Sequence, residues 1–476
     1  MAALSASVLV ALYAFLWVRS RKNPLFLAGA AAFLGLGRSM YINIVPDQIL
    51  RQVAFVSVTT GDVLFAAVVL GWVYARGRRP ALRVHLSHRW MVIGVCVAYF
   101  LALELALSYE NVAGLHPTLI VSARDWFYIP FGFLLTLDVL RRFTPHEVVQ
   151  FVSVLSLATT LLMLLYIASA IGIPVFPYPK YLTTSFLGTT IIRDSSTFPY
   201  WIALAWGYYL TLPKKNAWVF AALGILAAGT LLSYTRSWVL GLAAIVVLAV
   251  ILQFLQQERR VRALALLAAA VTLLAIFLAG GPALVPAQFD YLSSRFGLIN
   301  SPARALSDHN AQLRLELFRQ AQKAGAQVDS LFGAGLSDSA TPAYSRGNSY
   351  DSDWIRIVWR TGWAGVSVLA MPFLLAISWG MRGFLRERGS TESGMLLLAG
   401  TLATIFSFAH SFTFLTYFWW PALSLFPVAL IAYASGVPAG LPARGSGASV
   451  PHFEVHKHKP TGDRGRLVTM NHDSAT

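Results

Sequence analysis

The chain has 476 residues, of which 57% are hydrophobic and 12% charged, and its mean hydropathy is +0.61. Soluble domains carry about 25% charged residues, so this composition excludes an ordinary soluble protein and indicates a membrane protein. The formal net charge of +16 would also suit a nucleic-acid-binding protein. Basic residues, however, orient the cytoplasmic loops of membrane proteins and bind anionic substrates. We therefore expect the lipid bilayer as a partner and no nucleic acid.

Apolar runs recur along nearly the whole chain. A helix needs about 20 apolar residues to cross about 30 Å of hydrocarbon. These runs predict an all-α, polytopic transmembrane helix bundle of 12 to 13 spans, the number depending on whether 24–37 crosses fully. They form a single transmembrane domain over 1–434. The predicted spans are 2–18, 24–37, 53–75, 90–109, 117–140, 148–172, 197–212, 217–233, 237–255, 264–280, 353–379, 393–414 and 415–434.

The basic residues of the short connections predict the orientation of the bundle. The first apolar run, Met1 to Val18, has no basic residue before it, and its charges follow it. This is typical of a retained helix with its N-terminus outside, not of a signal peptide. With that start, every short inside loop is basic, as the positive-inside rule requires. The topology is therefore N-terminus outside and C-terminus inside. The basic clusters of these inside loops are Arg19 to Lys22, Arg76 to Arg89, Arg141 and Arg142, Lys214 and Lys215, Arg259 to Arg262, and Arg382 to Arg388.

Orientation does not explain the basic residues that fall on the outer side. An arginine near the hydrocarbon costs free energy, so several together indicate a charged partner or an anionic ligand. For any one of them, a surface or snorkelling position is the alternative. They are Arg38, Arg51, Arg124, Lys180, Arg193, Arg236, Arg295, Arg304, Arg314, Arg319, Lys323, Arg346, Arg356 and Arg360.

One long outer segment, 281–352, is predicted to be a periplasmic loop or lid within the domain. Within it, 310–325 has apolar residues at helical spacing among charged ones, which predicts an amphipathic helix. The segment from Phe332 to Gly347 is rich in turn residues. The tail 435–476 is rich in Gly, Pro, Ala and His, and we expect it to be disordered and cytoplasmic.

Four outer features carry guanidinium groups, which suit phosphate and pyrophosphate because the planar fork donates two hydrogen bonds and stays charged. Asp353, Arg356 and Arg360 lie on one face of a predicted helix. An intrahelical charge network is the alternative for these three. The other features are Arg193 before the span 197–212, Arg236 before the span 237–255, and Arg314 on the predicted loop helix.

Ionisable and aromatic residues also gather on the outer side. Intramembrane acids such as Glu104 and Asp125 are functional candidates, although a pair of Asp125 with Arg124 would be structural. His410 is a candidate binding residue, with a satisfied helix-end histidine as the alternative. The residues Tyr417 to Trp420, which include Trp419, suit an aromatic belt or a platform on which a sugar stacks.

Neither a cofactor nor a metal is predicted. The single cysteine, Cys96, excludes a multi-cysteine metal site, and His456 and His458 have no partner acids. No P-loop and no dinucleotide-binding glycine motif occurs. An outward-facing site without nucleotide requires a substrate that arrives already activated.

These pieces, in this order, resemble the superfamily of O-antigen ligases and Wzy-type O-antigen or exopolysaccharide polymerases. Members have about a dozen helices, a large late periplasmic loop and the motif H-N-x-Y-L-x-x-L-x-E-x-G-L-x-G. Gly362 and Gly365 fit the motif's glycines, and Trp354, Ile355 and Val358 its aromatic and apolar positions. FGAGL, from Phe332 to Leu336, resembles the family's F-G-x-G-x turn. The arginine positions of the family correspond to Arg193 before Ser196 to Phe198, Arg236 in SYTRSW, and Arg314 in LRLELFRQA.

Two positions depart from the ligase pattern. Asp351 stands where ligases carry histidine, and Arg360 stands where glutamate is usual. An aspartate at the histidine position is more in keeping with the polymerases. The resemblance covers roughly 185–365 and implies a GT-C-like bundle in a bacterial inner membrane with its active site on the periplasmic side.

What the resemblance implies is an inverting, metal-independent transfer between undecaprenyl-diphosphate-linked oligosaccharides, with a chain-length regulator as a further partner. Arg236 and Arg314 would stabilise the leaving diphosphate, and Asp351, or Asp353 in reserve, would accept the proton of the attacking hydroxyl. Arg193, Arg356, Arg360, Arg124, His410, Trp419 and Trp420 would bind substrate. An O-antigen ligase, which attaches the glycan to lipid A core or another acceptor, and a polysaccharide or lipid transporter are the alternatives.

Overall fold

The structure is a computed structural model of the chain. It describes residues 51–53, 56–58, 88–111, 130–171, 173, 183–186, 189–192, 198–212, 216–233, 236–256, 353–387, 391–411 and 426–436, and parts of 69–77 and of 260–335. The chain divides into two units, Met1–Leu441 and Pro442–Thr476. The second unit, and with it most of the predicted tail 435–476, lies outside the described residues, and the domain boundaries stay predictions.

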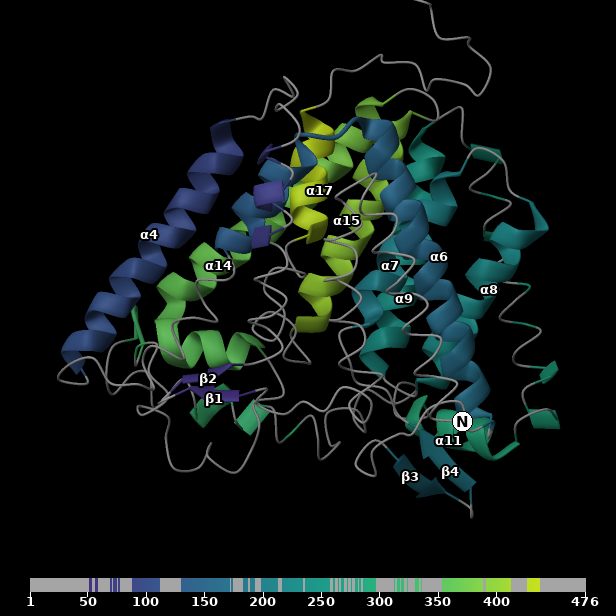
Figure 1. Cartoon of the computed structure of the whole chain (residues 1–476). Coiled ribbons are helices and arrows are strands. Elements are labelled where there is room, and N and C mark those ends of the chain that lie inside the picture. The colour runs from purple at the N-terminus through teal and green to yellow at the C-terminus, as the bar shows by residue number, and fades with distance from the viewer. Residues whose placement is uncertain are drawn as a thin grey trace, which may run out of the picture. The chain divides into compact units, whose positions relative to one another are not determined.

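The described part of the chain is predominantly α-helical, as predicted (Figure 1). Five of its helical segments are long and apolar enough to cross a membrane, by length and composition. The longer helices are α4 (His88–Asn111), α6 (Pro145–Ala170), α7 (Phe198–Thr211), α8 (Ala217–Leu232), α9 (Arg236–Leu255), α14 (Asp353–Arg386) and α15 (Glu392–Ser411). Shorter ones are α11 (Pro286–Phe296), α17 (Phe426–Ser435) and the segment Pro130–Leu140.

The helix bounds agree closely with the predicted spans where both are described. The windows 90–109, 148–172, 197–212, 217–233, 237–255 and 393–414 coincide with α4, α6, α7, α8, α9 and α15. The predicted spans 2–18 and 24–37 lie outside the described residues, so the total of 12 to 13 stays a prediction. The described residues of the predicted loop helix 310–325 are helical, and α11 adds a second helix to the loop 281–352.

Two short antiparallel hairpins differ from the prediction of an all-α chain. β1 (Arg51–Val53) pairs with β2 (Val56–Val58), at the start of the predicted span 53–75. β3 (Thr183–Phe186) pairs with β4 (Thr189–Ile192), just before the residues that lead into α7. Valine, threonine and isoleucine dominate these strands, and such β-branched residues favour extended backbone.

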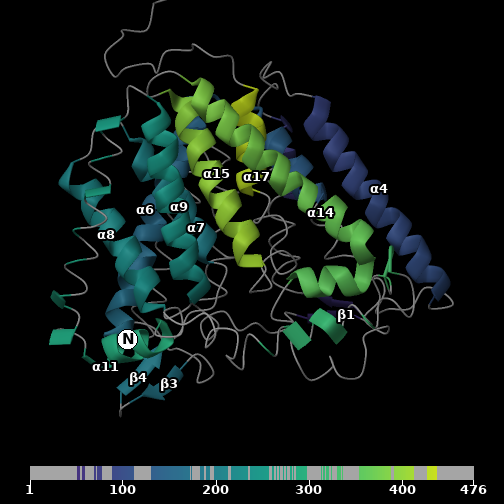
Figure 2. The same cartoon turned by 180° about the vertical axis from the view of Figure 1, so that it is seen from behind.

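The helix α15 is the centre of the bundle and is buried on almost all sides. An apolar helix without a polar face is stable only where other helices surround it. Small residues bring its neighbours close. A side chain added at Gly207 of α7 would meet the backbone of Ala399, and one added at Gly400 would meet Pro427 and Ile431 of α17. Figures 1 and 2 show α15 among α7, α14 and α17 from opposite sides.

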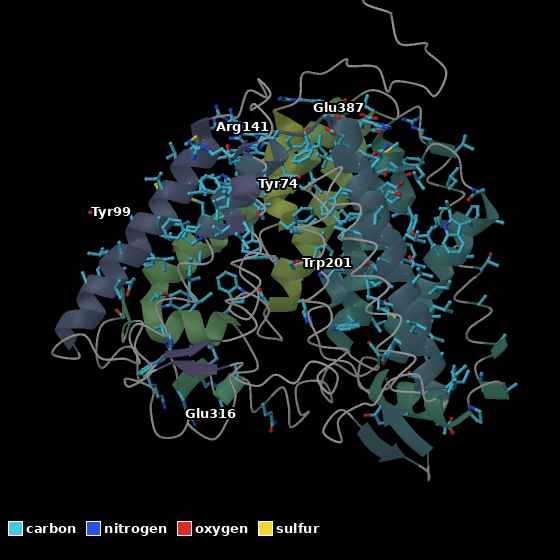
Figure 3. The ribbon with its side chains drawn as sticks, viewed as in Figure 1. Tyr74, Tyr99, Arg141, Trp201, Glu316 and Glu387 are labelled. Atoms are coloured by element: carbon cyan, nitrogen blue, oxygen red, sulfur yellow. The ribbon has the colours of Figure 1, made fainter. Side chains whose placement is uncertain are left out.

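One end of the bundle is held by contacts among helix ends that neighbour the predicted cytoplasmic loops. The hydroxyl of Tyr433 in α17 donates a 2.7 Å hydrogen bond to the carbonyl of Phe143, just before α6. The amide of Gln256, after α9, donates to the carbonyl of Phe384 in α14. Figure 3 places Arg141 and Glu387 at this end, which we call the basic end.

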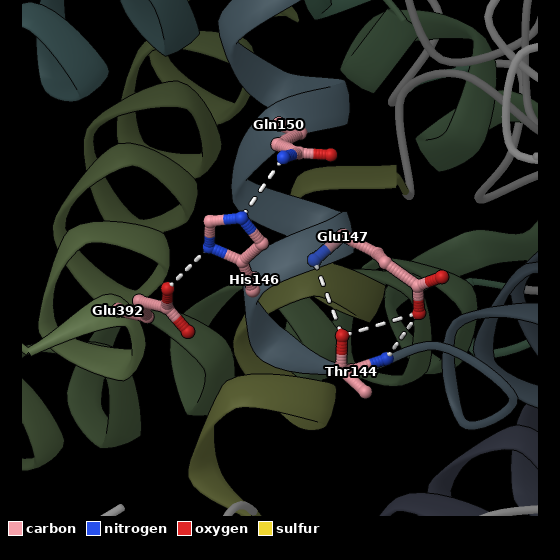
Figure 4. A network of polar contacts seen from close by, with 5 residues as sticks. All are labelled: Thr144, His146, Glu147, Gln150 and Glu392. Carbon is pink, nitrogen blue, oxygen red and sulfur yellow. Dashed lines mark hydrogen bonds and ion pairs between the residues drawn. The ribbon is translucent and has the colours of Figure 1, made fainter. Parts of the chain in front are cut away.

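A polar network at the basic end joins the starts of α6 and α15 (Figure 4). His146 Nδ1 lies 2.8 Å from a carboxylate oxygen of Glu392, and His146 Nε2 lies 2.9 Å from the amide nitrogen of Gln150. Thr144 and Glu147 form a reciprocal capping box at the first turn of α6. At the other end, which we call the opposite end, the hydroxyl of Tyr166 in α6 donates to the carbonyl of Leu232 at the end of α8.

Candidate functional site

The helix α14 bends sharply at Gly362, where the backbone has φ 57° and ψ −160°. A bend of this kind breaks the regular hydrogen-bond ladder of a helix and leaves backbone groups that need other partners. The turn Ser330–Gly335 supplies them. The amide of Gly335 donates to the carbonyl of Arg360 at 2.8 Å, and the amide of Ala364 donates to the carbonyl of Leu331 at 3.0 Å. The predicted span 353–379 is therefore not one continuous helix but two helical segments that meet at Gly362.

Glycine is required on both sides of this contact. Gly333 and Gly362 have φ angles of 74° and 57°, in the left-handed region that other residues rarely adopt. A Cβ at Gly333 would lie 2.7 Å from the carbonyl carbon of Arg360 and from the amide of Gly362. The two glycine motifs that carry the family resemblance, FGAGL and the glycines of α14, are therefore packed directly against each other.

The start of α14 is attached to the end of α15. The indole Nε1 of Trp354 donates a 2.7 Å hydrogen bond to the hydroxyl of Ser411, which itself donates to the carbonyl of Phe408 at 2.6 Å. The ring of Trp354 also lies edge-on to Phe408, with centroids 5.5 Å apart. Because Asp353 precedes Trp354, the first turn of α14 with its charged residues lies beside the last turn of α15.

The start of α9 reaches the same place. The ring of Trp238 lies edge-on to His410, with centroids 6.4 Å apart and planes at 78°. Trp238 follows Arg236 by two residues and is fully buried. The ring of His410 also lies close to the ring of Phe406. Three segments far apart in sequence, the starts of α9 and α14 and the end of α15, therefore meet at the opposite end of the bundle (Figure 2).

Buried ionisable side chains are rare and occur on three of the helices. Among the residues whose exposure the structure describes, the buried Asp, Glu, Lys, Arg and His side chains are Glu104, Arg360 and His410, with exposed fractions of 0%, 2% and 3%. A snorkelling or surface position does not fit Arg360, because its side chain is enclosed. Burying an ionisable group inside a membrane protein costs free energy, so such a group indicates a functional role or a charged partner.

The other predicted site residues fall in two groups. Arg236, Asp353 and Arg356 lie in α9 and α14 by their backbone, and the structure does not describe their side chains. Asp351, Arg193, Arg314, Arg124, Trp419 and Trp420 lie outside the described residues. The structure thus brings the backbone positions of Arg236 and Asp353 close to the end of α15, which carries His410, through Trp238 and Trp354. Arg360 lies about two turns further along α14, beside Gly333 and Gly335.

Trp238, Trp354 and Ser411 take part in the site although the sequence did not single them out as functional. Trp354 stands on the aromatic position of the family motif, and the only signal for Trp238 and Ser411 is their position near Arg236 and His410. A tryptophan at a span end is more often part of an aromatic belt. Chemically, this arrangement offers permanent positive charge from arginine, a histidine that can exchange a proton, and aromatic faces. Within the described residues, no three His, Cys, Asp or Glu side chains lie close enough together to hold a metal ion.

No model of a known protein family matches the chain, and no curated protein matches it.

Proposed function

We propose that the protein is a periplasmic-face glycosyltransferase that polymerises undecaprenyl-diphosphate-linked oligosaccharide repeat units, an O-antigen or exopolysaccharide polymerase. The observation that carries the proposal is the packing of Gly333 and Gly335 against Arg360 and Gly362. Gly333 and Gly335 belong to the FGAGL turn, and Gly362 belongs to the glycine motif of α14. All three have positive φ angles, which glycine adopts readily. The meeting of the α9 start, which carries Arg236, with the α14 start supports it further.

The reaction requires two kinds of group. The hydroxyl of one repeat unit attacks the anomeric carbon of another, its proton passes to a carboxylate, and the carbon–oxygen bond to the lipid diphosphate breaks with inversion. Asp351 is the proposed base, and Asp353 is the alternative. A positioned base contributes roughly 10² to 10⁴ in rate.

The leaving diphosphate is the larger energetic problem, because it already carries two negative charges and gains a third beside a membrane as the carbon–oxygen bond breaks. Arg236 and Arg314 are proposed to stabilise it, with Arg193, Arg356, Arg360 and Arg124 binding the same substrate. By analogy with oxyanion holes, each preorganised donor contributes about 2.7 to 4 kcal/mol. His410, Trp419 and Trp420 are proposed to bind the glycan.

The proposed location is a bacterial inner membrane, with the basic end cytoplasmic and the site periplasmic. Arg141 and Arg142 lie at the basic end, which fits the positive-inside rule. A transporter would place ionisable groups across the midplane and at both faces. The buried Arg360 and His410 instead lie near the starts and ends of helices that meet at the opposite end, which favours a site on one face.

The deciding experiment uses the purified full chain in detergent with a lipid-diphosphate-linked repeat unit and no nucleotide or added metal. We expect dimers and longer products, separated by gel electrophoresis. Arg236→Ala and Arg314→Ala should each lower the rate by at least about 100-fold at unchanged protein level. Arg382→Ala, an exposed residue of α14 at the basic end, is the control and should leave the rate unchanged. Near-normal product ladders from either site variant would refute the role of these arginines.

Gene deletion separates the polymerase from the ligase. Cells that lose a polymerase should make lipopolysaccharide with a single repeat unit, whereas cells that lose a ligase should accumulate long polymer on the lipid carrier. Asp351→Asn tests the base. If that variant keeps its activity and Asp353→Asn loses it, the base is Asp353.

A further inference from the structure

Three exposed arginines flank the contact between the start of α4 and the end of α14. They are Arg89, Arg382 and Arg386. The rings of Trp90 and Trp379 lie 4.7 Å apart at 82°, and the two helices run side by side in both views (Figures 1 and 2). Because Trp90 lies near the start of α4 and Trp379 near the end of α14, the helices are antiparallel. Arg89, directly before Trp90, therefore lies at the basic end together with Arg382 and Arg386.

The turn of the two helices places these arginines on one side of the pair. At 3.6 residues per turn, Arg89 is rotated by about 100° from Trp90 around α4, and Arg382 by about 60° from Trp379 around α14. Both rotations have the same sense along their own helix, and in an antiparallel pair the same sense leads to the same side. Arg386 follows Arg382 by about one turn and shares its face. The three arginines therefore border one side of the α4–α14 contact.

Four carboxylates at the basic end already interact with donors of the same chain. The pairs are Asp138 with Trp72 and Arg142, Glu147 with Thr144, Glu387 with Thr391, and Glu392 with His146. Within the part of the chain that the structure describes, no ion pair joins Arg89, Arg382 or Arg386 to a carboxylate. The N–H donors of these three arginines are therefore available to an anion from outside the chain.

Exposed apolar side chains continue from the arginines along the same side of both helices. Leu374 of α14 and Leu103 of α4 have exposed fractions of 53% and 38%. By helical rotation they lie on the side of Arg382 and Arg89. Each of the two helices contains a segment long and apolar enough to cross a membrane. Positive charge beside an apolar surface suits an amphiphile with an anionic headgroup, whereas a free anion would use only the charge.

We propose that Arg89, Arg382 and Arg386 bind the phosphate of an anionic phospholipid whose acyl chains lie along the exposed side of α4 and α14. A guanidinium group donates paired hydrogen bonds to phosphate oxygens and keeps its charge. The contact of Trp90 with Trp379 fixes the two helices beside each other, so arginines from both border one headgroup. This lipid site lies at the basic end, away from the candidate site at the opposite end, and does not depend on the proposed function.

Native mass spectrometry of the purified full chain tests the lipid site. The protein in a neutral detergent is titrated with phosphatidylglycerol and, separately, with phosphatidylcholine that has the same acyl chains. We expect one phosphatidylglycerol to bind more tightly than phosphatidylcholine. Arg89→Gln with Arg382→Gln should weaken the binding of phosphatidylglycerol about tenfold or more, because both changes remove a positive charge beside the anionic headgroup.

A matched control removes two exposed positive charges from the loop 281–352 instead. Arg319→Gln with Lys323→Gln has the same net charge as the site variant and should bind phosphatidylglycerol like the wild type. Equal losses in the two double variants would overturn the proposal, because the lipid would then respond to net charge alone. Should the site variant fold poorly, Arg386→Gln alone decides, with an expected loss of about fivefold and unchanged binding as the contrary result.

Inorganic phosphate separates a bound lipid from a free anion. Sodium phosphate at the same concentration as the lipid should leave the bound phosphatidylglycerol in place, because it has no acyl chains to lie on the exposed leucines. Displacement of the lipid by an equal concentration of phosphate would overturn the assignment to a phospholipid. No glycan enters any of these measurements, so their outcome is independent of the glycosyltransferase assay.

Discussion

The indole nitrogen of Trp354 donates a 2.7 Å hydrogen bond to the hydroxyl of Ser411, across 57 residues of sequence. It joins the first turn of α14 to the last residue of α15. Because Ser411 also donates to the carbonyl of Phe408 at 2.6 Å, its oxygen is free to accept from the indole with fixed geometry. This bond sets the place at which Asp353 and the following charged turn begin.

The Trp354–Ser411 bond predicts a specific loss in Ser411→Ala. Removing the buried acceptor should lower the free energy of unfolding by about 1 to 3 kcal/mol, because a buried donor loses its partner. The control is Ser367→Ala, since Ser367 is exposed and donates to the carbonyl of Trp363 within α14. The control should stay within about 0.5 kcal/mol of the wild type. Thermal unfolding in detergent measures both, and equal effects would contradict the assignment.

The bend at Gly362 predicts that alanine is not tolerated there. A Cβ at Gly362 would meet the carbonyl of Leu331, and a residue other than glycine costs about 1 to 3 kcal/mol in this backbone region. We expect Gly362→Ala to separate the turn Ser330–Gly335 from α14 and to abolish polymer formation. Protease cleavage near 330–335, followed by mass spectrometry, should become faster.

Two further variants sharpen the test of the bend. Gly333→Ala breaks the same contact from the other side, so the double variant should be no less stable than the worse single one. Gly77→Ala is the control, because an added Cβ there meets nothing within 4 Å. Additive losses in Gly333→Ala and Gly362→Ala would show that the two glycines do not act together.

The extent of the helices could be predicted from sequence because it depends mainly on apolar length. For that reason the predicted window 90–109 agrees with α4, and the predicted window 393–414 agrees with α15. The bend in α14 could not be predicted, because Gly362 is tolerated in a helix and only the arriving turn makes the bend favourable. The hairpin Thr183–Ile192 was missed because a short β-branched run between spans has no periodicity long enough to detect.

The types of residue in the candidate site could be predicted from the sequence. The burial of their side chains could not. The sequence indicates that Arg360 shares a face with Asp353 and Arg356, which suits either a ligand or a charge network. Burial of Arg360 depends on the direction in which the segment 353–361 leaves the bend at Gly362. That direction is set by tertiary contacts. In the same way, the contact of Trp238 with His410 joins spans that no sequence pattern links.

Close helix packing predicts losses of different size at two glycines of similar appearance. A Cβ at Gly207 would lie 2.5 Å from the Cα of Ala399, so α7 and the central helix α15 would have to separate. At Gly229 the obstacle is the thioether of Met163, a flexible side chain that can change rotamer. We expect Gly207→Ala to cost about 1 to 3 kcal/mol of unfolding free energy and Gly229→Ala clearly less. If Gly229→Ala is the more destabilising of the two, α15 is not the rigid centre of the bundle.

The network in Figure 4 predicts that a helix cap matters more than a cross-helix hydrogen bond. Thr144 Oγ1 accepts from the amide of Glu147 at 3.3 Å, and the carboxylate of Glu147 accepts from the amide of Thr144 at 2.9 Å. Thr144→Ala removes half of this capping box and should cost about 0.5 to 2 kcal/mol. His146 donates from Nδ1 to Glu392 and accepts at Nε2 from Gln150, since the carboxylate can only accept and the amide nitrogen can only donate.

The histidine side chain is 56% exposed, so water competes for the hydrogen bond to Glu392. His146→Ala should therefore cost about 1 kcal/mol or less. Thermal unfolding of the two variants measures both effects. If His146→Ala proves the more damaging change, the link between α6 and α15 depends on packing of the imidazole ring and not on this hydrogen bond.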